Sequence, residues 1–379
     1  MTERISFIST LIQFIAVCLV QLLMLIQAGI TYLLMRRKFK NYIPPKGLVP
    51  LDNKTFLKNK LVSIIIPAYN EENNIEKTLK TLVNRCSDPI NLEIIIVDAG
   101  CTDNTMMIVK KMSEYIKEKH GICIRYDIKA KGGRGPTLNA GSLIARGNIL
   151  LFLHADTLLP IGYDDVLRYE LKNENVLATA FRFKVSKSST QVVGVGVMEA
   201  SVYFRSRVYE LPFGDQAIAM TRQRYDSIGG FPNEPIMEDF ELVQKLRRAG
   251  AGGAGYIKTL MAPAECNIRR WEKYGIARTN LTNQFVMIAY VYGGYSPSDI
   301  YHFYYHFNLK NYIEDWYYKQ QLKWFWGEEI YDDIRGTTIT TSTSTSSKNV
   351  NTNSENCDDM IQNKKEMSWE TINETTCSK

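Results

Sequence analysis

The stretch VSIIIPAYNEENNIEKTLKTL, residues 62–82, predicts a buried strand followed by an amphipathic helix. Its first part is a short β-branched run that ends at Pro67, and its second part places apolar residues at helical spacing. The stretch LEIIIVD, residues 92–98, is a second apolar strand. Two buried strands joined by a helix form a βαβ unit, so we expect a parallel sheet covered on both faces.

The same alternation continues through residues 61–272, which we take as the main domain. Further strands are expected at 122–128 and 148–156, and helices at 72–83, 104–116 and 238–250. The predicted fold class is therefore α/β, Rossmann-like, with a mainly parallel sheet and helices on both faces.

An uncharged run occupies residues 5–35. A bilayer core needs roughly 20 helical residues, whereas the apolar core of a signal peptide has about 7–15. We therefore predict a transmembrane helix within an N-terminal anchor, residues 1–40. The alternative is a buried amphipathic hairpin, which Gln13, Gln21 and Gln27 favour.

Basic residues crowd positions 36–40, directly after this run. The positive-inside rule then predicts a single-pass membrane protein whose main domain faces the cytosol. Seven scattered cysteines without a CxxC pair favour a reducing compartment. Placement in a lumen stays open as the alternative, because sequons at Asn53, Asn280 and Asn373 would permit it.

Three segments outside the main domain differ in composition. Residues 41–60 are typical of a linker, and residues 336–379 are typical of a disordered Ser/Thr/Asn-rich tail. Residues 273–335 predict an aromatic-rich helical extension, either near the membrane interface or as an ordinary cap over the core. The net charge of +6 is modest and nothing resembles a zinc finger or a basic arm, so we expect no nucleic-acid partner.

Polar residues follow three of the predicted strands where each strand ends. They are Asn70 and Glu71 after the first strand, Asp98 after the second, and His154 and Asp156 after the fourth. Ligands bind at the carboxyl ends of the strands in an open parallel sheet, although any one of these residues could simply cap a helix or a turn. Asp156 is the strongest candidate to hold Mg²⁺ or Mn²⁺, with phosphates completing the shell.

A glycine-rich segment, residues 131–135, precedes a helix that contains Asn139. Glycines let the backbone approach a ligand closely, and Arg134 can pair with phosphate. The alternative is a flexible turn. The segment is neither a Walker loop nor a dinucleotide fingerprint.

Two later motifs carry charge. Glu238 and Asp239 open a helix, where they either cap it or provide a general base that deprotonates a hydroxyl. Arg269 and Arg270 could clamp a pyrophosphate while Trp271 stacks on a sugar, or they could be a surface basic pair.

These motifs, in this order, resemble family 2 glycosyltransferases with the GT-A fold. The resemblance covers about residues 61–310 and rests on VSIIIPAYNEENNIEKTLKTL, EIIIVDAGCTDNT, FLHADT, PIMEDFELVQKLRRAG and NIRRW. The segments GGRGPTLNAG, FLHADTLLP and FGDQAIAMTR are similar to one bacterial-type subgroup, usually described only as glycosyltransferase-like.

The resemblance implies roles for individual residues. Asp156 matches the last acid of the DxD motif that binds metal, and Asp239, beside Glu238, matches the catalytic base of the ED motif. The implied substrate-binding residues are Ala68, Tyr69, Asn70, Glu71, Asp98, Arg134, Asn139, His154, Asp215, Gln216, Arg269, Arg270 and Trp271. Two positions depart from the pattern, since His154 replaces the first acid of DxD and Asn267 replaces the Gln of QxxRW.

The implied activity is inverting transfer of a sugar from a nucleotide-diphosphate sugar to a hydroxyl acceptor, with a lipid acceptor as one hypothesis. Asp239 would be the base, and Mg²⁺ or Mn²⁺ on Asp156 would stabilise the leaving group. The expected partners are the sugar nucleotide, an acceptor of unknown identity and the bilayer. The alternative is a catalytically inactive, membrane-anchored sugar-nucleotide-binding protein, which His154 favours.

Overall fold

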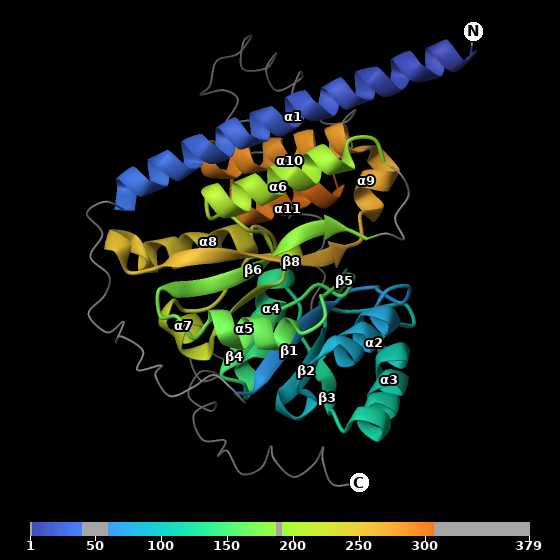
Figure 1. Ribbon diagram of the computed structural model, residues 1–379, viewed down its shortest axis with the longest axis vertical. Coiled ribbons are helices and arrows are strands. Elements are labelled where there is room, and N and C mark those ends of the chain that lie inside the picture. The colour runs from blue at the N-terminus through green and yellow to red at the C-terminus, as the bar shows by residue number, and fades with distance from the viewer. Residues whose placement is uncertain (1, 40–59, 187–191, 307–379) are drawn as a thin grey trace, which may run out of the picture. The chain divides into compact units, whose positions relative to one another are not determined.

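The computed structural model describes residues 2–39, 60–186 and 192–306 (Figure 1). Its strands are β1 Val62–Ala68, β2 Leu92–Asp98, β3 Ile124–Lys129, β4 Ile149–Phe152, β5 Thr157–Leu158, β6 Val176–Val185, β7 Ile218–Thr221 and β8 Tyr256–Cys266. Its α-helices are α1 Thr2–Phe39, α2 Ile75–Arg85, α3 Thr105–His120, α4 Arg134–Ile144, α5 Tyr163–Glu170, α6 Val195–Val208, α7 Arg222–Ser227, α8 Glu238–Ala249, α9 Arg269–Tyr274, α10 Ile276–Val291 and α11 Pro297–His306. Short 3₁₀ turns are η1 Pro89–Asn91, η2 Gly214–Gln216 and η3 Ala251–Gly253.

The strands form one sheet in the order β3-β2-β1-β4-β7-β6-β8-β5. The first four strands are parallel, and Val62 pairs with Leu92 on one side and Ile149 on the other. The strand β7 runs antiparallel to both β4 and β6, and β5 runs antiparallel to β8. The predicted α/β fold with a mainly parallel sheet is confirmed, and the antiparallel insertion of β7 is an addition to it.

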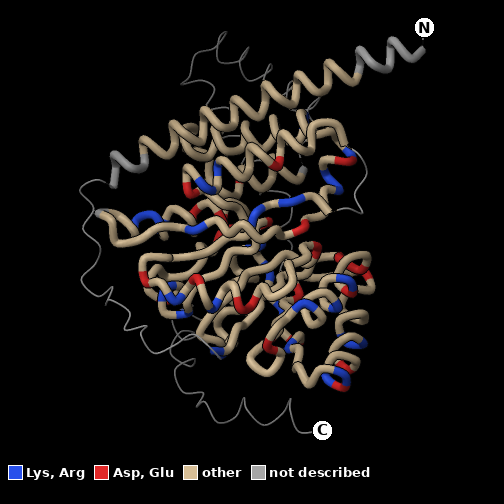
Figure 2. Tube along the Cα trace, in the orientation of Figure 1, with Lys and Arg blue, Asp and Glu red and all other residues tan. Residues whose placement is uncertain are grey.

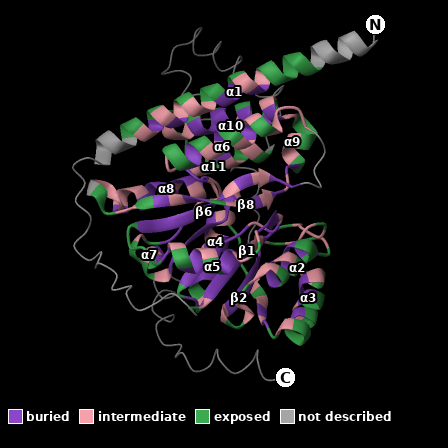
Figure 3. Cartoon of the chain, in the orientation of Figure 1, coloured by how far each residue is buried: buried purple, intermediate pink, exposed green. Residues whose placement is uncertain are grey.

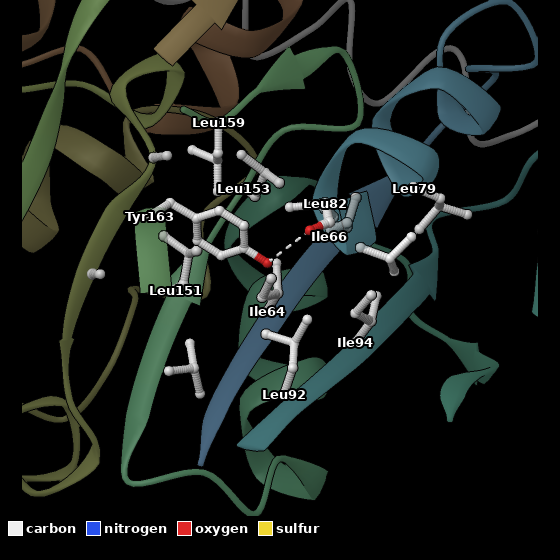
Figure 4. Packing of buried hydrophobic residues seen from close by; sticks show 14 of the residues in the cluster. Ile64, Ile66, Leu79, Leu82, Leu92, Ile94, Leu151, Leu153, Leu159 and Tyr163 are labelled. Atoms are coloured by element: carbon white, nitrogen blue, oxygen red, sulfur yellow. Dashed lines mark hydrogen bonds between the residues drawn. The ribbon is translucent and has the colours of Figure 1, made fainter. Parts of the chain in front are cut away.

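Alternate residues of β1 enter different cores, as expected for a strand buried on both faces. Ile64 and Ile66 pack with Leu79 and Leu82 of α2, whereas Ile65 packs on the opposite face with α4. Figure 4 shows the first of these clusters, in which the Tyr163 hydroxyl donates to the Leu82 carbonyl oxygen at 3.3 Å. The carboxyl ends of β1 and β2 are thereby fixed side by side.

The described part of α1 is one continuous apolar helix, so the hairpin alternative is wrong. The segment Thr10–Leu34 has a mean hydropathy of 2.3 and the length needed to cross a bilayer. Figure 2 shows no charged residue along this segment.

One side of α1 packs across α6 and α10 (Figure 1). Thr31 and the hydroxyl of Tyr292 lie 3.0 Å apart, and a Cβ on Gly29 would lie 3.0 Å from the hydroxyl oxygen of Tyr209. The other side exposes large apolar side chains, as the exposed residues along α1 in Figure 3 indicate. The helix is therefore both a wall of the folded unit and an apolar surface.

Helices α10 and α11, from the predicted extension 273–335, join the same core as α8 and the sheet, through Met287 and Ile300. The boundary at residue 272 stays a prediction. Residues 307–335, the tail 336–379 and positions 41–59 of the predicted linker lie outside the described residues. Among the described residues, Cys18, Cys86, Cys101 and Cys266 form no disulfide. The sequon residue Asn280 is buried and accepts a hydrogen bond from the Trp271 indole at 2.7 Å.

Candidate active site

A cavity of about 720 Å³ gathers many of the predicted site residues. Those that line it are Arg134, His154, Asp156, Asp215, Glu238, Asp239, Arg269, Arg270 and Trp271. They come from the segment after β4, from η2 and from the first turns of α4, α8 and α9. Residues that lie far apart in the sequence thus share one space large enough for a small-molecule ligand.

The two acids that open α8 have different surroundings. Asp239 accepts a hydrogen bond from the Gly214 amide at 2.9 Å and faces the cavity. Glu238 is 2% exposed and pairs with Arg134 at 3.3 Å, and burial raises its pKa to about 7. Met237, just before them, has a positive φ of 67°, a conformation that non-glycine residues rarely adopt.

The imidazole of His154 lies against the backbone of η2. A Cβ on Gly214 would lie 2.8 Å from His154 Nε2, so a side chain there would displace the ring. Burial, reinforced by the charge of Arg134, lowers the pKa of His154 to about 3. The ring is therefore neutral at physiological pH and can accept a hydrogen bond or ligate a metal through nitrogen.

The carboxylate of Asp156 is paired with Arg269 at 3.2 Å. Arg269 also reaches Glu71 at 2.8 Å, so it joins the end of β1 to the cavity. Across residues 2–39, 60–186 and 192–306 there is no cluster of three or more His, Cys, Asp or Glu that could hold a metal ion. A divalent cation would fit only in the manner typical of Mg²⁺, with Asp156 as one ligand and diphosphate oxygens supplying others.

Asp215 faces a buried arginine that the motifs did not predict. Burial raises the pKa of Asp215 to about 6, and the same desolvation lowers the pKa of Arg205 to about 10. Asp215 Oδ1 and Arg205 Nε have no hydrogen-bond partner among the described residues. Met198, Ser201, Val202 and Arg205 line the cavity at helical spacing, so they share one face of α6.

Five of the predicted substrate-binding residues lie outside this cavity, at the ends of β1 and β2; they are Ala68, Tyr69, Asn70, Glu71 and Asp98. Asn70 accepts a hydrogen bond from the Thr102 amide at 2.8 Å, which ties the two loops together. Asp98 accepts from the amides of Gly100 and Cys101 at 2.9 and 2.7 Å. Burial alone would raise the pKa of Asp98, but these amides hold it below its usual value. Ala68 is fully buried, and Tyr69 is 62% exposed.

Two predicted substrate-binding residues have their side-chain amides engaged by the protein. Asn139 donates to the Phe231 carbonyl oxygen at 3.0 Å and accepts from the Tyr225 hydroxyl at 2.6 Å. Gln216 is fully buried and donates to the Phe181 carbonyl oxygen at 2.9 Å. These contacts support the loops around residues 213–216 and 229–233, and contact of Asn139 and Gln216 with a ligand stays a prediction.

The glycines of the segment 131–135 serve packing. A Cβ on Gly133 would lie 2.3 Å from the Pro235 Cα atom, and one on Gly135 would lie 2.3 Å from the Pro232 carbonyl oxygen. These two glycines therefore allow α4 to approach the turn before α8 closely, and they do not provide space for a ligand as we expected. This approach brings Arg134 within reach of Glu238.

The chain is similar to several known glycosyltransferases. The family described as Glycosyl transferase family 2 matches residues 63–228. The probable glycosyltransferase YdaM of Bacillus subtilis strain 168 is 25% identical over 233 residues, which cover 57% of this chain and 54% of that protein. The poly(ribitol-phosphate) beta-glucosyltransferase of Bacillus spizizenii is 34% identical over 115 residues, which cover 30% of this chain and 17% of that protein.

Among solved structures, the mannosyltransferase PcManGT from Pyrobaculum calidifontis, in complex with GDP-Man and Mn²⁺, has a TM-score of 0.45 and 20% identity. That match covers 71% of this chain and 74% of the other. The chain spans about half, or less, of the length of the two curated relatives named above, so what the sequences share is a domain. The segment 63–228, which runs from β1 to the end of α7, is therefore a glycosyltransferase family 2 domain.

Proposed function

We propose that this chain transfers a sugar from a nucleotide-diphosphate sugar to an acceptor hydroxyl, with inversion at the anomeric carbon. The observation that carries the proposal is the shared cavity of Asp239 and Asp156, which Arg269 links to Glu71 at the end of β1. The cavity thus contains Asp239 as a base, Asp156 as a carboxylate that could bind a metal next to the diphosphate, and several cationic side chains.

Asp239 is the group that takes the acceptor proton. The Gly214 amide and the first turn of α8 fix its carboxylate, since the helix N-terminus favours negative charge. Glu238 is less suited to this role because its carboxylate is buried against Arg134. Its part in the proposal is to orient Arg134.

The departing diphosphate needs positive charge. Arg269, Arg270 and Arg134 line the cavity and supply it through charge-assisted hydrogen bonds. When bound, Mg²⁺ or Mn²⁺ would add Lewis-acid stabilisation of the leaving group, with Asp156 as its protein ligand. Arg269 would then share or release Asp156, to which it is paired at 3.2 Å.

The test is Asp239→Asn, which removes the base and keeps the shape. Turnover of the sugar nucleotide should fall by about 10²–10⁴, while donor binding, measured as a thermal shift with sugar nucleotide and Mn²⁺, persists. The matched control is Asp226→Asn, the same change at an exposed position of α7 outside the cavity, which should keep full activity. Full turnover in Asp239→Asn would refute the assignment.

A second candidate is a sugar-nucleotide-binding protein without turnover. It is favoured by His154 at the first DxD position. Both candidates predict a thermal shift with the donor. Only the enzyme predicts release of nucleoside diphosphate that depends on Asp239.

The membrane placement belongs to the proposal as well. Helix α1 would span the bilayer once, and the basic residues 36–40 would keep the catalytic domain in the cytosol. Protease protection in sealed microsomes tests this placement. Digestion of the catalytic domain from outside supports it, and protection of that domain contradicts it.

A further inference from the structure

Four arginines line the cavity, and they differ in what lies next to their charge. Arg134 and Arg269 are paired with carboxylates at 3.3 and 2.8 Å, and Arg205 faces Asp215. Arg270 forms no ion pair with any carboxylate of the described residues. Its positive charge is therefore not neutralised by a neighbouring acid and is available to an anion in the cavity.

The guanidinium of Arg270 lies instead over the ring of Tyr304, with its central carbon 3.8 Å from the ring centroid. A cation within about 6 Å of an aromatic face is attracted by the ring, and a planar guanidinium also stacks on it. Burial raises the pKa of Tyr304, so the phenol keeps its proton and adds no negative charge. The ring thus orients Arg270 and leaves its charge intact.

The position of the Tyr304 ring is fixed by α10 and α11, which lie between α1 and the sheet in Figure 1. The Tyr304 hydroxyl donates to Asn283 Oδ1 of α10 at 3.1 Å, and both residues line the cavity. On α11, Ile300 is 2% exposed in the core, and the rings of Phe303 and Phe285 lie 5.2 Å apart. The aromatic partner of Arg270 therefore belongs to a packed element.

Resting on the proposed function, we propose that Tyr304 is a positioning residue for the donor: its ring holds the Arg270 guanidinium toward the diphosphate. From one fixed orientation the guanidinium can donate to two phosphate oxygens at once. Tyr304 takes no part in bond making. Because α11 lies beyond the segment 63–228 that matches the family, the donor site is completed by a helix outside that segment.

Inorganic pyrophosphate is the probe, because it has the diphosphate charge of the donor without a base or a sugar. Isothermal titration calorimetry on the full chain in detergent, with Mn²⁺ present, measures its Kd. Tyr304→Leu removes the ring and should raise this Kd roughly five- to tenfold. Tyr304→Phe keeps the ring and loses only the hydrogen bond to Asn283, so its Kd should stay within about twofold of the wild type.

The matched control is Tyr295→Leu, the same change in the loop between α10 and α11. Tyr295 is 55% exposed and does not line the cavity, so the Kd for pyrophosphate should not change. If Tyr304→Leu does not fold, Tyr304→Met takes its place, since a flexible side chain fills the space without an aromatic face. The same five- to tenfold rise is then expected.

A double-mutant cycle separates positioning from general support of the fold. Arg270→Gln removes the cation and should weaken pyrophosphate binding at least as much as Tyr304→Leu does. In the Arg270→Gln background, Tyr304→Leu should add less than about twofold, because its effect passes through Arg270. An equal loss with and without Arg270 would show that Tyr304 only supports the fold, and it would overturn the proposal.

Three other results would also overturn it. Equal losses in Tyr304→Phe and Tyr304→Leu would mean that the hydroxyl matters and the ring does not. Tighter binding in Tyr304→Leu would mean that the ring holds Arg270 away from the diphosphate. A wild-type chain that does not bind pyrophosphate would have no diphosphate site for Arg270 to serve.

This proposal and the proposed function fail in different ways. Donor turnover that depends on Asp239, together with an unchanged Kd across the Tyr304 variants, overturns the role of Tyr304 and leaves the transferase intact. Absence of donor turnover, together with pyrophosphate binding that depends on the Tyr304 ring, overturns the transferase and supports the role of Tyr304.

Discussion

The loops after β1 and β2 and the cavity between the sheet and α1 both contain carboxylates, but the two regions satisfy them differently. In the loops, Asp98 accepts from amides two and three residues ahead of it. In the cavity, Asp215 Oδ1 is buried without a described partner, and so are polar atoms of Arg205 and Gln21. Locally satisfied groups stabilise a loop whether or not a ligand is present, whereas unsatisfied buried groups favour the bound state.

The largest loss of stability is expected in the core beneath the loops that follow β1 and β2. Leu79 is fully buried between α2 and the sheet, so Leu79→Ala should cost about 2–5 kcal/mol of unfolding free energy. Chemical denaturation in detergent, followed by circular dichroism, measures this loss. Leu143→Ala, at an 81% exposed position of α4, is the control and should change little. Equal losses of unfolding free energy in the two variants would show that the core under the parallel strands does not stabilise these loops.

The cavity should show the opposite pH dependence from the loops. The pKa of Asp215 is about 6 in the folded state against 3.8 as the ordinary value, so the unfolded chain loses this proton first as pH rises. The unfolding free energy should then fall as pH rises from about 4 to 6, by up to about 3 kcal/mol for this group. Comparing denaturation of the wild type and Asp215→Asn across that range measures it, and the variant should have the flatter profile. If the unfolding free energies of the two proteins changed with pH in parallel, the pKa of Asp215 would not be raised in the folded state.

Packing of α4 against the turn before α8 is the next test. Gly135→Ala places a Cβ 2.3 Å from the Pro232 carbonyl oxygen and should cost about 1–3 kcal/mol, with loss of the Arg134–Glu238 pair. The control is Gly196→Ala in α6, which meets nothing within 4 Å and should be neutral or slightly stabilising. The Tm values of both variants decide, and an unchanged Tm for Gly135→Ala would contradict the close approach.

The smallest effect is expected at Asp98. Its lowered pKa means that its stabilising contribution is present above its ordinary value of 3.8 and is lost as pH falls through the folded value. Asp98→Asn should therefore cost about 1 kcal/mol at neutral pH and nothing in strong acid. If the unfolding free energy lost in Asp98→Asn instead increased as the pH fell, the loops would not have the pH dependence that distinguishes them from the cavity.

Much of the loop region could be predicted from the sequence. The range of β2 agrees with the prediction, and β1 extends one residue past the predicted end at Pro67, because short apolar runs between turn residues have few alternatives. The acids at strand ends were located by the same pattern. The contacts of Asn139 and Gly135 could not be predicted, because their partners at residues 229–235 lie about a hundred positions away in the sequence.

By itself the sequence determined the alternation of strands and helices, the apolar helix and the motifs that carry charge. These follow from periodicity and from the spacing of residue types along a short stretch. Only the tertiary structure decided that Gln21 of α1 and Arg205 of α6 share a cavity with Asp239, and that Asp156 is paired with Arg269. The reason is physical: a buried group's environment is set by the segments packed against it, and here they come from both ends of the described chain.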